Sequence, residues 1–477
     1  MKTGVRFPVG PLKSMIILAI ETSCDETAAA ILKCSGKLKN PRFEILSNVV
    51  ASQVKIHSQW GGVVPSLAKR EHQKNLIPIL IRTLKKASLL NSKSEARNSR
   101  PAFGGARFAR EARRARLVPM DIGTAKFKIL NSILKREPEL LEKLLKFLRE
   151  HQEPKIDVIA VTQGPGLEPA LWVGINFAKA LAIVWDKPLI AINHMEGHIA
   201  SVLLKQNRGS TKHEARKIIS NFEFPAVSLL ASGGHTQLIL INPPAGGWGE
   251  YKIIGETLDD AAGEAFDKVA RMLGLGYPGG PAIATEAAKS KIRNPKHETN
   301  SKFNPPTGGQ NSKFALPRPM LNSKDFNFSF SGLKTAVLYK IRDLPKEVRP
   351  QGGAKRRDEV EPQINEIRSL IAREFQQAVI DVLIKKTLRA AKEFKVKTII
   401  LGGGVAANKE LRRQLKKAVS RENVKINDRK YLLKLLLPHI KFTGDNAAMI
   451  ALAAYFHVKK KEFANWQTLR AQGNLRL

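Results

Sequence analysis

Apolar runs of five or six residues alternate along the chain with longer amphipathic stretches. Two pairs of such runs enclose short polar turns, namely residues 16–20 with 28–32 and residues 226–231 with 237–241. Short apolar runs favour buried strands, and their pairing across a turn predicts a hairpin at each place. Because the second hairpin repeats the first about 200 residues later, the pattern predicts two similar lobes.

Three further apolar runs predict strands at residues 157–162, 188–192 and 398–401. Amphipathic stretches predict helices at residues 170–184 and 409–419, each following one of these strands. Strands that alternate with helices in this way are typical of an α/β protein.

Three segments lack apolar periodicity: residues 91–125, 289–313 and 345–358. They are rich in Arg, Lys, Asn, Pro and Gly, and such compositions bury too little apolar surface to offset the entropy of ordering. We expect disordered insertions at these positions. A second interpretation, basic arms that contact RNA, stays open.

The charge of the chain is strongly positive. Its 477 residues, enough for two or three domains, include 80 Lys plus Arg against 42 Asp plus Glu, a formal net charge of +38. This balance attracts polyanions, with nucleic acid as the first candidate and an anionic membrane surface as the second. A generally basic proteome, or the basic insertions alone, would give the same balance.

Cysteine usage and the N-terminus predict a cytoplasmic protein. Cys24 and Cys34 are the only cysteines, so no disulfide framework is expected and a reducing compartment is favoured. No apolar run reaches the length of a membrane helix, and the run at residues 15–20 is too short for a signal sequence. We therefore expect a tail at residues 1–14, followed by a first strand.

Two histidines stand four residues apart directly after the run at residues 188–192. In His194-Met195-Glu196-Gly197-His198 the two imidazoles lie one helical turn apart and can share a divalent metal. The alternative is a pair of unrelated surface histidines. A zinc peptidase is disfavoured, because Glu196 is displaced from the position that a general base takes in HExxH.

Asp445 is a candidate third ligand. It follows a strand-like stretch ending at Phe442 and precedes an apolar helical pattern that runs to about Tyr455. Two His and one carboxylate leave coordination positions open and suit Fe(II) or Zn(II). The alternative is an aspartate that merely caps the helix.

Glycine-rich and acidic segments offer further candidate binding sites. Ser232-Gly233-Gly234-His235-Thr236 and Gly402 to Asn408 each permit close approach of backbone to a ligand. Asp260, Glu264 and Asp267 are predicted on one helix face, which is either a solvated acidic face or an edge that binds hydroxyl groups.

These segments together resemble one family, the TsaD family of tRNA adenosine threonylcarbamoyltransferases, formerly called glycoproteases. The resemblance covers residues 15–455 outside the insertions and rests on ten segments in family order: ETSCDET, WGGVVPSLAKREH, VTQGPGL, NHMEGH, LLASGGHTQL, DDAAGEAFDK, YPGGP, FSFSGLKT, GGGVAAN and TGDNAAM. It implies an actin-like, two-lobed α/β fold with duplicated RNase H-like domains around a central cleft. The expected divisions are a tail at 1–14, lobes at 15–205 and 222–445, and a C-terminal helix and tail at 446–477 that return to the first lobe.

The resemblance also implies roles for individual residues. His194, His198 and Asp445 match metal ligands for one divalent metal per chain, iron as Fe(II) with zinc as the alternative. Asp25 and Glu26 match the acidic pair of the first loop, in a general acid/base or positioning role. The residues that match the binding set for threonylcarbamoyl-adenylate are Leu230, Ala231, Ser232, Gly233, Gly234, Asp267, Gly280 and Asn408.

The implied reaction is transfer of a threonylcarbamoyl group from its adenylate to N6 of adenosine 37 in tRNAs that read codons beginning with A, with release of AMP. The implied partners are tRNA and proteins like TsaB and TsaE, with no membrane. Three alternatives are kept: a kinase or ATPase of the same fold, which would not need the histidine pair; a metal-dependent peptidase; and a non-enzymatic RNA-binding scaffold.

Overall fold

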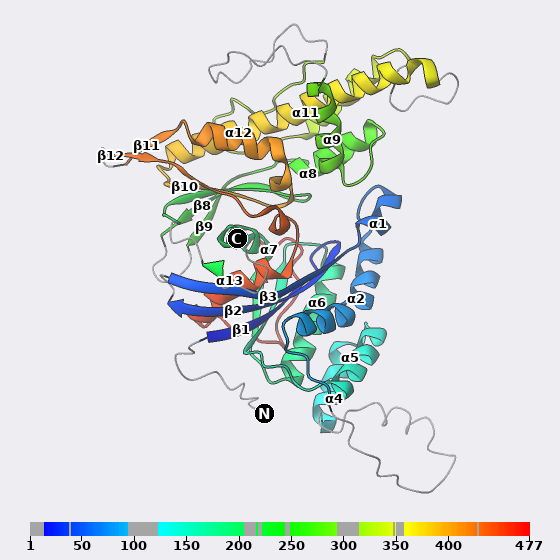
Figure 1. Cartoon of the computed structure of the whole chain (residues 1–477), viewed down its shortest axis with the longest axis vertical. Coiled ribbons are helices and arrows are strands. Elements are labelled where there is room, and N and C mark those ends of the chain that lie inside the picture. Colours follow the sequence, from blue (N-terminus) through cyan, green and yellow to red (C-terminus); the bar gives the residue numbers. More distant parts are fainter. Residues whose placement is uncertain are drawn as a thin grey trace, which may run out of the picture.

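The chain forms two α/β lobes, one above the other in Figure 1. The computed structural model describes residues 14–37, 40–93, 123–204, 216–217, 222–243, 249–292, 314–346, 349, 357–426 and 429–477. Each lobe is built on a mixed sheet, and helices cover the faces of both sheets.

The sheet of the first lobe has the strand order β5-β4-β1-β2-β3-β6. Strands β1, β2 and β3 form an antiparallel meander, and β4 and β5 follow on the other side of β1, each parallel to its neighbour. The strands are β1 (Ser14–Glu21), β2 (Glu26–Lys37), β3 (Asn40–Ser52), β4 (Val158–Gly164), β5 (Leu189–Asn193) and β6 (Arg216–Lys217).

The sheet of the second lobe repeats this arrangement in the order β9-β8-β7-β10-β13. Again three strands form an antiparallel meander, and two parallel strands follow on the other side of the first. The strands are β7 (Ala226–Ala231), β8 (Thr236–Asn242), β9 (Glu250–Glu256), β10 (Thr398–Gly402) and β13 (Lys434–Leu436), with β11 (Asn423–Ile426) and β12 (Arg429–Leu432) in a separate ribbon. The shared order confirms the predicted duplication and the α/β class.

The described residues contain twelve α-helices, and none of them is long and apolar enough to cross a membrane. Their bounds are α1 (Val54–His57), α2 (Pro65–Lys86), α4 (Gly123–Ile133), α5 (Pro138–Glu150), α6 (Glu168–Val184), α7 (His194–Ala200), α8 (Ala262–Met272), α9 (Gly279–Ile292), α10 (Ser331–Arg342), α11 (Arg357–Glu393), α12 (Lys409–Val419) and α13 (Ala447–Lys460).

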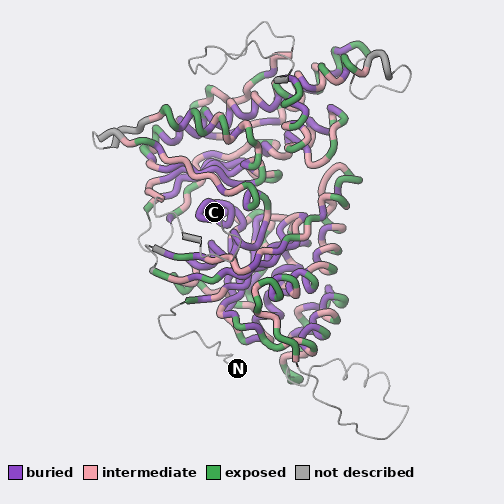
Figure 2. The backbone as a smooth tube through the Cα atoms, in the orientation of Figure 1, coloured by how far each residue is buried: buried purple, intermediate pink, exposed green. Residues whose placement is uncertain are grey.

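The alternating side chains of β1 divide the first lobe into two cores. Leu18 and Ile20 pack with helices α2, α5 and α6, whereas Ile17 and Ala19 pack on the opposite face with α7 and α13. This division follows from the two-residue period of a strand. The buried positions concentrate along both sheets and the helices beside them (Figure 2).

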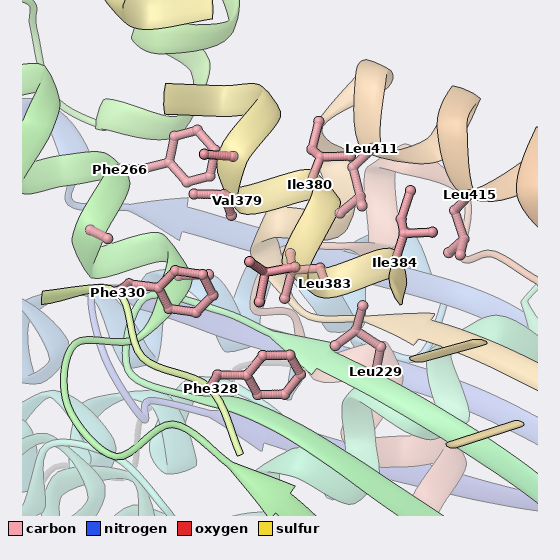
Figure 3. Close-up of a cluster of buried hydrophobic side chains, with 14 of the residues drawn as sticks. Leu229, Phe266, Phe328, Phe330, Val379, Ile380, Leu383, Ile384, Leu411 and Leu415 are labelled. Atoms are coloured by element: carbon pink, nitrogen blue, oxygen red, sulfur yellow. The ribbon is translucent and has the colours of Figure 1, made fainter. Parts of the chain in front are cut away.

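A separate core fills the outer side of the second lobe (Figure 3). Phe266 of α8 and the rings of Phe328 and Phe330 pack with the apolar face of α11, which contributes Val379 and Leu383. This core fixes α8, which carries Glu264 and Asp267. Asp260, expected on the same helix face, precedes the helix, so that expectation is wrong for this residue.

The inner faces of the two sheets share one core, with α7 and α13 between them. Met195 and Ile199 of α7 belong to the same buried cluster as Leu230 of β7 and Ile400 of β10. The helix that carries the paired histidines therefore lies where the two lobes meet (Figure 1).

Two sequence-based expectations need correction. The stretch that ends at Phe442 is not a strand: β13 stops at Leu436, Pro438 follows, and Ile440–Phe442 form a 3-10 turn. A proline cannot donate to a strand ladder, which is the physical reason that the strand ends before it.

The ends of the expected insertions are also ordered. Lys93 N donates to Glu150 O at 2.9 Å, and α4 begins at Gly123. Helix α9 extends to Ile292, and α11 begins at Arg357. The remaining parts of the predicted insertions, residues 94–122, 293–313, 347–348 and 350–356, lie outside the described residues.

Candidate active site and metal centre

Helix α7 begins directly where β5 ends. The Asn193 side chain accepts a hydrogen bond from Met195 N at 2.8 Å and so caps the helix. Gly197 lies against α13, where a Cβ atom would stand 3.0 Å from Ile450 Cδ1. Glycine thus allows the two helices to approach closely, and both histidines of α7 face the start of α13.

The three predicted ligands meet at this point. His194 Nε2 and His198 Nε2 each lie 3.3 Å from Asp445 Oδ1. The two imidazole rings are 4.7 Å apart between centroids and nearly perpendicular, and one ligand atom from each of the three residues lies within 4.8 Å of the others. The alternative of unrelated surface histidines is wrong, because both rings are buried.

Asp445 is not the cap of α13. Asn446 occupies the N-cap position, and its side chain accepts a hydrogen bond from Met449 N at 3.2 Å. The interpretation of Asp445 as a capping aspartate is therefore wrong. Its carboxylate faces the histidines instead.

Glu21 holds His194 from the other side. This fully buried carboxylate accepts from Ser23 N and Thr162 Oγ1, both at 2.5 Å, and its Oε2 lies 3.1 Å from His194 Nδ1. A carboxylate on the outer nitrogen of a metal-binding histidine orients the ring and leaves Nε2 to the metal.

The charges of the cluster are strongly coupled. Burial lowers the pKa of His194, but Asp445 and Glu21 outweigh burial and raise it to about 10. Burial likewise raises the pKa of Asp445, and His194 outweighs that effect and holds it well below its usual range. Burial lowers the pKa of His198, so this second ring is neutral at pH 7, the form that binds metal.

The cluster fits a divalent cation. Both ring nitrogens of His198 are buried and make no hydrogen bond within the described part of the chain; Nε2 is near Asp445 Oδ1 but lacks hydrogen-bond geometry. An unsatisfied buried polar group is costly, and a cation between the three side chains would satisfy it. One nitrogen from each ring and one carboxylate oxygen suit Fe(II) or Zn(II), and binding would displace the proton that His194 carries.

A buried network fixes the first loop, between β1 and β2, beside this cluster. Ser23 Oγ lies 3.2 Å from His194 Nδ1, and His72 Nε2 lies 3.0 Å from Cys24 O. Burial lowers the pKa of His72 to about 4, so the ring is neutral, and its Nδ1 lies 2.8 Å from Thr27 Oγ1. Gln53 N also donates to Asp25 O, at 2.9 Å.

In the acidic pair of Asp25 and Glu26, Glu26 is affected by the charge of Asp445. Asp25 is buried, and Glu26 Oε1 accepts from Ser52 Oγ at 3.2 Å. Burial, followed by the charges of Asp445 and Asp25, raises the pKa of Glu26 to about 10. Glu26 is therefore within electrostatic reach of Asp445, although the acidic pair lies where β2 begins and Asp445 lies just before α13.

The glycine-rich turns of the second lobe meet at the ends of the parallel strands β7 and β10. Ser232 O accepts from Gly263 N at 3.1 Å, and Gly403, with a φ of +84°, packs against Ala231, where a Cβ would stand 2.3 Å from the carbonyl oxygen. Gly233 and Gly234 face open space, whereas Leu230 and Ala231 are buried at the end of β7. Backbone near Gly233 and Gly234 is thus open to a ligand.

Asp267, Gly280 and Asn408 flank these turns. Asp267 Oδ1 accepts from Gly279 N at 2.7 Å, and the neighbouring Gly280 has no atom near the position of a Cβ. Asn408 caps α12, since its Oδ1 accepts from Glu410 N and Leu411 N, while its Nδ2 donates to Gln376 at 2.8 Å.

The two halves of the site interact across the lobes. Burial, and then the charges of His194 and His198, lower the pKa of His235 to about 4. Burial, and then Asp25 and Asp267, raise the pKa of Tyr277. His235 and Tyr277 of the second lobe are therefore within electrostatic reach of the paired histidines and of Asp25 in the first lobe.

Sequence reasoning missed Glu21 and His72. Glu21 was seen only as part of a polar turn, because its partners Thr162 and His194 lie far along the chain. A signal for His72 was present: it stands four residues before Leu76 and eight before Leu80, on the apolar face of α2. A histidine on such a face is buried and needs a hydrogen-bond partner.

Fold and site together define an α/β protein with two duplicated lobes and, where the lobes meet, a His-His-Asp cluster that could hold a metal ion. The model of the TsaD family, described as tRNA N6-adenosine threonylcarbamoyltransferase, matches residues 44–95 and 134–452. The chain belongs to this family.

Curated relatives with the same name match this chain over nearly their whole length. The protein of Syntrophomonas wolfei is 37% identical over 95% of this chain and 95% of its own. That of Thermosipho africanus is 38% identical over 97% and 100%, and that of Bacillus subtilis is 35% identical over 94% and 92%. All three are called tRNA N6-adenosine threonylcarbamoyltransferase.

Proposed function

We propose that this chain transfers a threonylcarbamoyl group from threonylcarbamoyl-adenylate to N6 of adenosine 37 in tRNAs that read codons beginning with A. Membership of the TsaD family supports the reaction class. The observation that carries the proposal is the convergence of His194, His198 and Asp445 with the glycine-rich turns where the lobes meet. The N6 amine attacks the carbamoyl carbon, the bond from that carbon to the phosphate oxygen breaks, and AMP leaves as the amine loses a proton.

His194, His198 and Asp445 would hold the metal, which we assign as Fe(II) with Zn(II) as the alternative. When bound, the cation supplies Lewis acidity and a positive charge that anchors donor oxygens. Glu21 fixes the ring of His194 through its Nδ1.

The remaining residues have roles on the donor and acceptor. We assign Asp267 to the ribose hydroxyls, Asn408 and Gly280 to the nucleoside, and Leu230, Ala231, Ser232, Gly233 and Gly234 to the adenylate. Asp25 and Glu26 take the general acid/base or positioning role, because His72 and Gln53 fix their loop beside the ligands.

The environment of Glu196 argues against a peptidase. Its carboxylate accepts from Tyr251 Oη at 3.2 Å and lies 2.8 Å from His457 Nε2. It is thus used in the packing of α7 against β9 and α13. A metal peptidase would need this carboxylate next to a metal-bound water.

Partners and location follow from the same proposal. We propose that the protein acts on tRNA in the cytoplasm, together with partners like TsaB and TsaE. The formal net charge of +38 supports a polyanionic substrate.

The test is an incubation of the full chain with threonylcarbamoyl-adenylate labelled in its carbamoyl carbon and with unmodified tRNA, alone and with candidate partner proteins. The proposal predicts label in tRNA nucleosides and an equal amount of AMP. Label that stays in the adenylate under all conditions, with ATP hydrolysis or peptide cleavage in parallel assays, would overturn it in favour of a kinase or a peptidase.

A further inference from the structure

The segment from Ser58 to Val64, here called the Trp60 loop, exposes a large aromatic ring. Trp60 exposes 68% of its surface, more than Tyr339 at 50%, the other exposed large aromatic of the described residues. It ends a 3-10 turn that closes on Gly61, whose φ of +65° is readily adopted by glycine. An indole held open to solvent in this way is available to a partner.

The Trp60 loop is anchored at its last residue and in its middle, and the helix α1 that precedes it is anchored at its N-cap. Gln53 N, at the start of α1, donates to Asp25 O at 2.9 Å, and Val64 N donates to His57 Nδ1 at 3.3 Å. Across the lobes, the Arg271 guanidinium donates to Gly61 O. The exposure of Trp60 is therefore a property of an anchored backbone, which lowers the entropy lost when a partner binds.

These anchors place Trp60 beside the proposed active site. Gln53 binds the backbone of Asp25, and Arg271 lies one helical turn beyond Asp267 on α8. The loop thus joins the acidic pair of the first lobe to the helix that carries the proposed ribose ligand.

We propose that Trp60 stacks on an unpaired base of the tRNA loop that carries the target adenosine. This inference rests on the proposed function. Unstacked bases of single-stranded RNA are bound on aromatic side chains, and such stacking tolerates any base because every base has a π face. The cations Lys55, which is exposed, and Arg271, which contacts the loop, suit RNA phosphates and favour RNA over an apolar protein surface.

The test compares Trp60→Ala and Trp60→Phe with Leu432→Ala in the full chain. Leu432 is 70% exposed on the β11–β12 ribbon of the second lobe and serves as the matched control for loss of an exposed apolar side chain. The dissociation constant for unmodified tRNA is measured by fluorescence anisotropy at several salt concentrations, and the dissociation constant for the adenylate is measured separately.

Trp60→Ala is expected to raise the dissociation constant for tRNA about tenfold, and Trp60→Phe by less than about threefold, because a base–aromatic stack is lost in one and kept in the other. The dependence on salt should keep its slope, since no phosphate contact is removed. Leu432→Ala should bind tRNA like the wild type, and all variants should bind the adenylate equally.

Unchanged tRNA affinity in Trp60→Ala would overturn the inference, and weakened binding of a protein partner in that variant would assign the ring to a protein interface instead. Failure of the wild type to bind tRNA even with its partner proteins present would instead refute the proposed function.

Discussion

Glu21 is a buried, charged residue whose hydrogen bonds hold the site together. Its carboxylate is fully buried and has three partners, Ser23, Thr162 and His194. Burial raises its pKa, but His194 outweighs burial, so the pKa is lowered and Glu21 stays ionised at neutral pH. Burying an ionised carboxylate is costly, and its interaction with the ring of His194 explains why Glu21 is charged here.

Replacement of each predicted ligand should remove the metal. We expect His194→Ala, His198→Ala and Asp445→Ala each to lower bound metal well below one per chain, because three ligands are needed to hold it. Metal analysis of the purified proteins measures this, and circular dichroism shows that they remain folded. Full occupancy in all three variants would eliminate the site.

Glu21→Gln should weaken metal binding without removing a ligand. The amide keeps the size of the side chain but loses the charge that orients His194, so metal affinity is expected to fall by about 10- to 100-fold. Competition with a chelator measures it. Glu44→Gln, which removes a half-buried carboxylate of a surface ion pair with Lys33, is the control and should bind metal like the wild type; equal affinities in both variants would contradict the role of Glu21.

At this scale the sequence predicts what lies close in the chain. The spacing of His194 and His198 is visible by eye, and Asp445 follows from family order. Glu21 and His72 act through partners up to 173 residues away, and only the fold brings these together.

At the scale of elements, the two glycines that begin α9 have opposite environments. A Cβ on Gly279 would stand 2.5 Å from Asp267 Cα, whereas Gly280 has nothing within 4 Å. Gly279→Ala should therefore lower the free energy of unfolding by about 1–3 kcal/mol, because backbone must move. Chemical denaturation measures this.

Gly280→Ala is the matched partner in that experiment. It should leave the free energy of unfolding nearly unchanged but weaken adenylate binding, because the added methyl group projects into the space proposed for the nucleoside. Equal losses of stability in both variants would show that Gly279 and Gly280 do not differ in the space around a Cβ atom.

Strand and helix positions follow from the sequence wherever periodicity is strong. Helix α12 has the bounds expected from its pattern, and both hairpins lie at their apolar runs. The stretch before Asp445 was misassigned because its apolar residues continue past Pro438, while the backbone there turns into a 3-10 helix capped by His439. Apolar composition alone does not distinguish a strand from a 3-10 helix over so short a stretch.

At the scale of the whole molecule, the duplication could be predicted from the repeated hairpin, because each hairpin begins a sheet of the same order. The shared core with α7 and α13 at its centre could not be predicted from the sequence, because it depends on contacts between segments distant in the chain. The position of the His-His-Asp cluster between the lobes is a consequence of that core.

The basic insertions should contribute little to stability. Deletion of residues 94–120 is expected to leave the melting temperature nearly unchanged, because their composition offers little apolar surface to bury. The deletion begins after Lys93, which hydrogen-bonds to α5. Scanning calorimetry measures it, and a large decrease would show that the segment is packed.

The same variant locates the charge that binds tRNA. If the lobes carry it, the logarithm of tRNA affinity should still fall steeply with the logarithm of salt concentration after deletion. A flat dependence, with adenylate binding intact, would show that tRNA recognition belongs to a partner protein.

We propose that the cluster of His194, His198 and Asp445 between the lobes directs threonylcarbamoyl transfer to one adenosine of tRNA. The most direct measurement is a single-turnover assay with labelled threonylcarbamoyl-adenylate, the metal-loaded protein with its partners, and two tRNAs that differ only in carrying adenosine or guanosine at position 37. We expect label on N6 of adenosine 37, one AMP released per label transferred, and no label on the guanosine tRNA. Equal labelling of both tRNAs, or release of AMP without labelling of either, would contradict it.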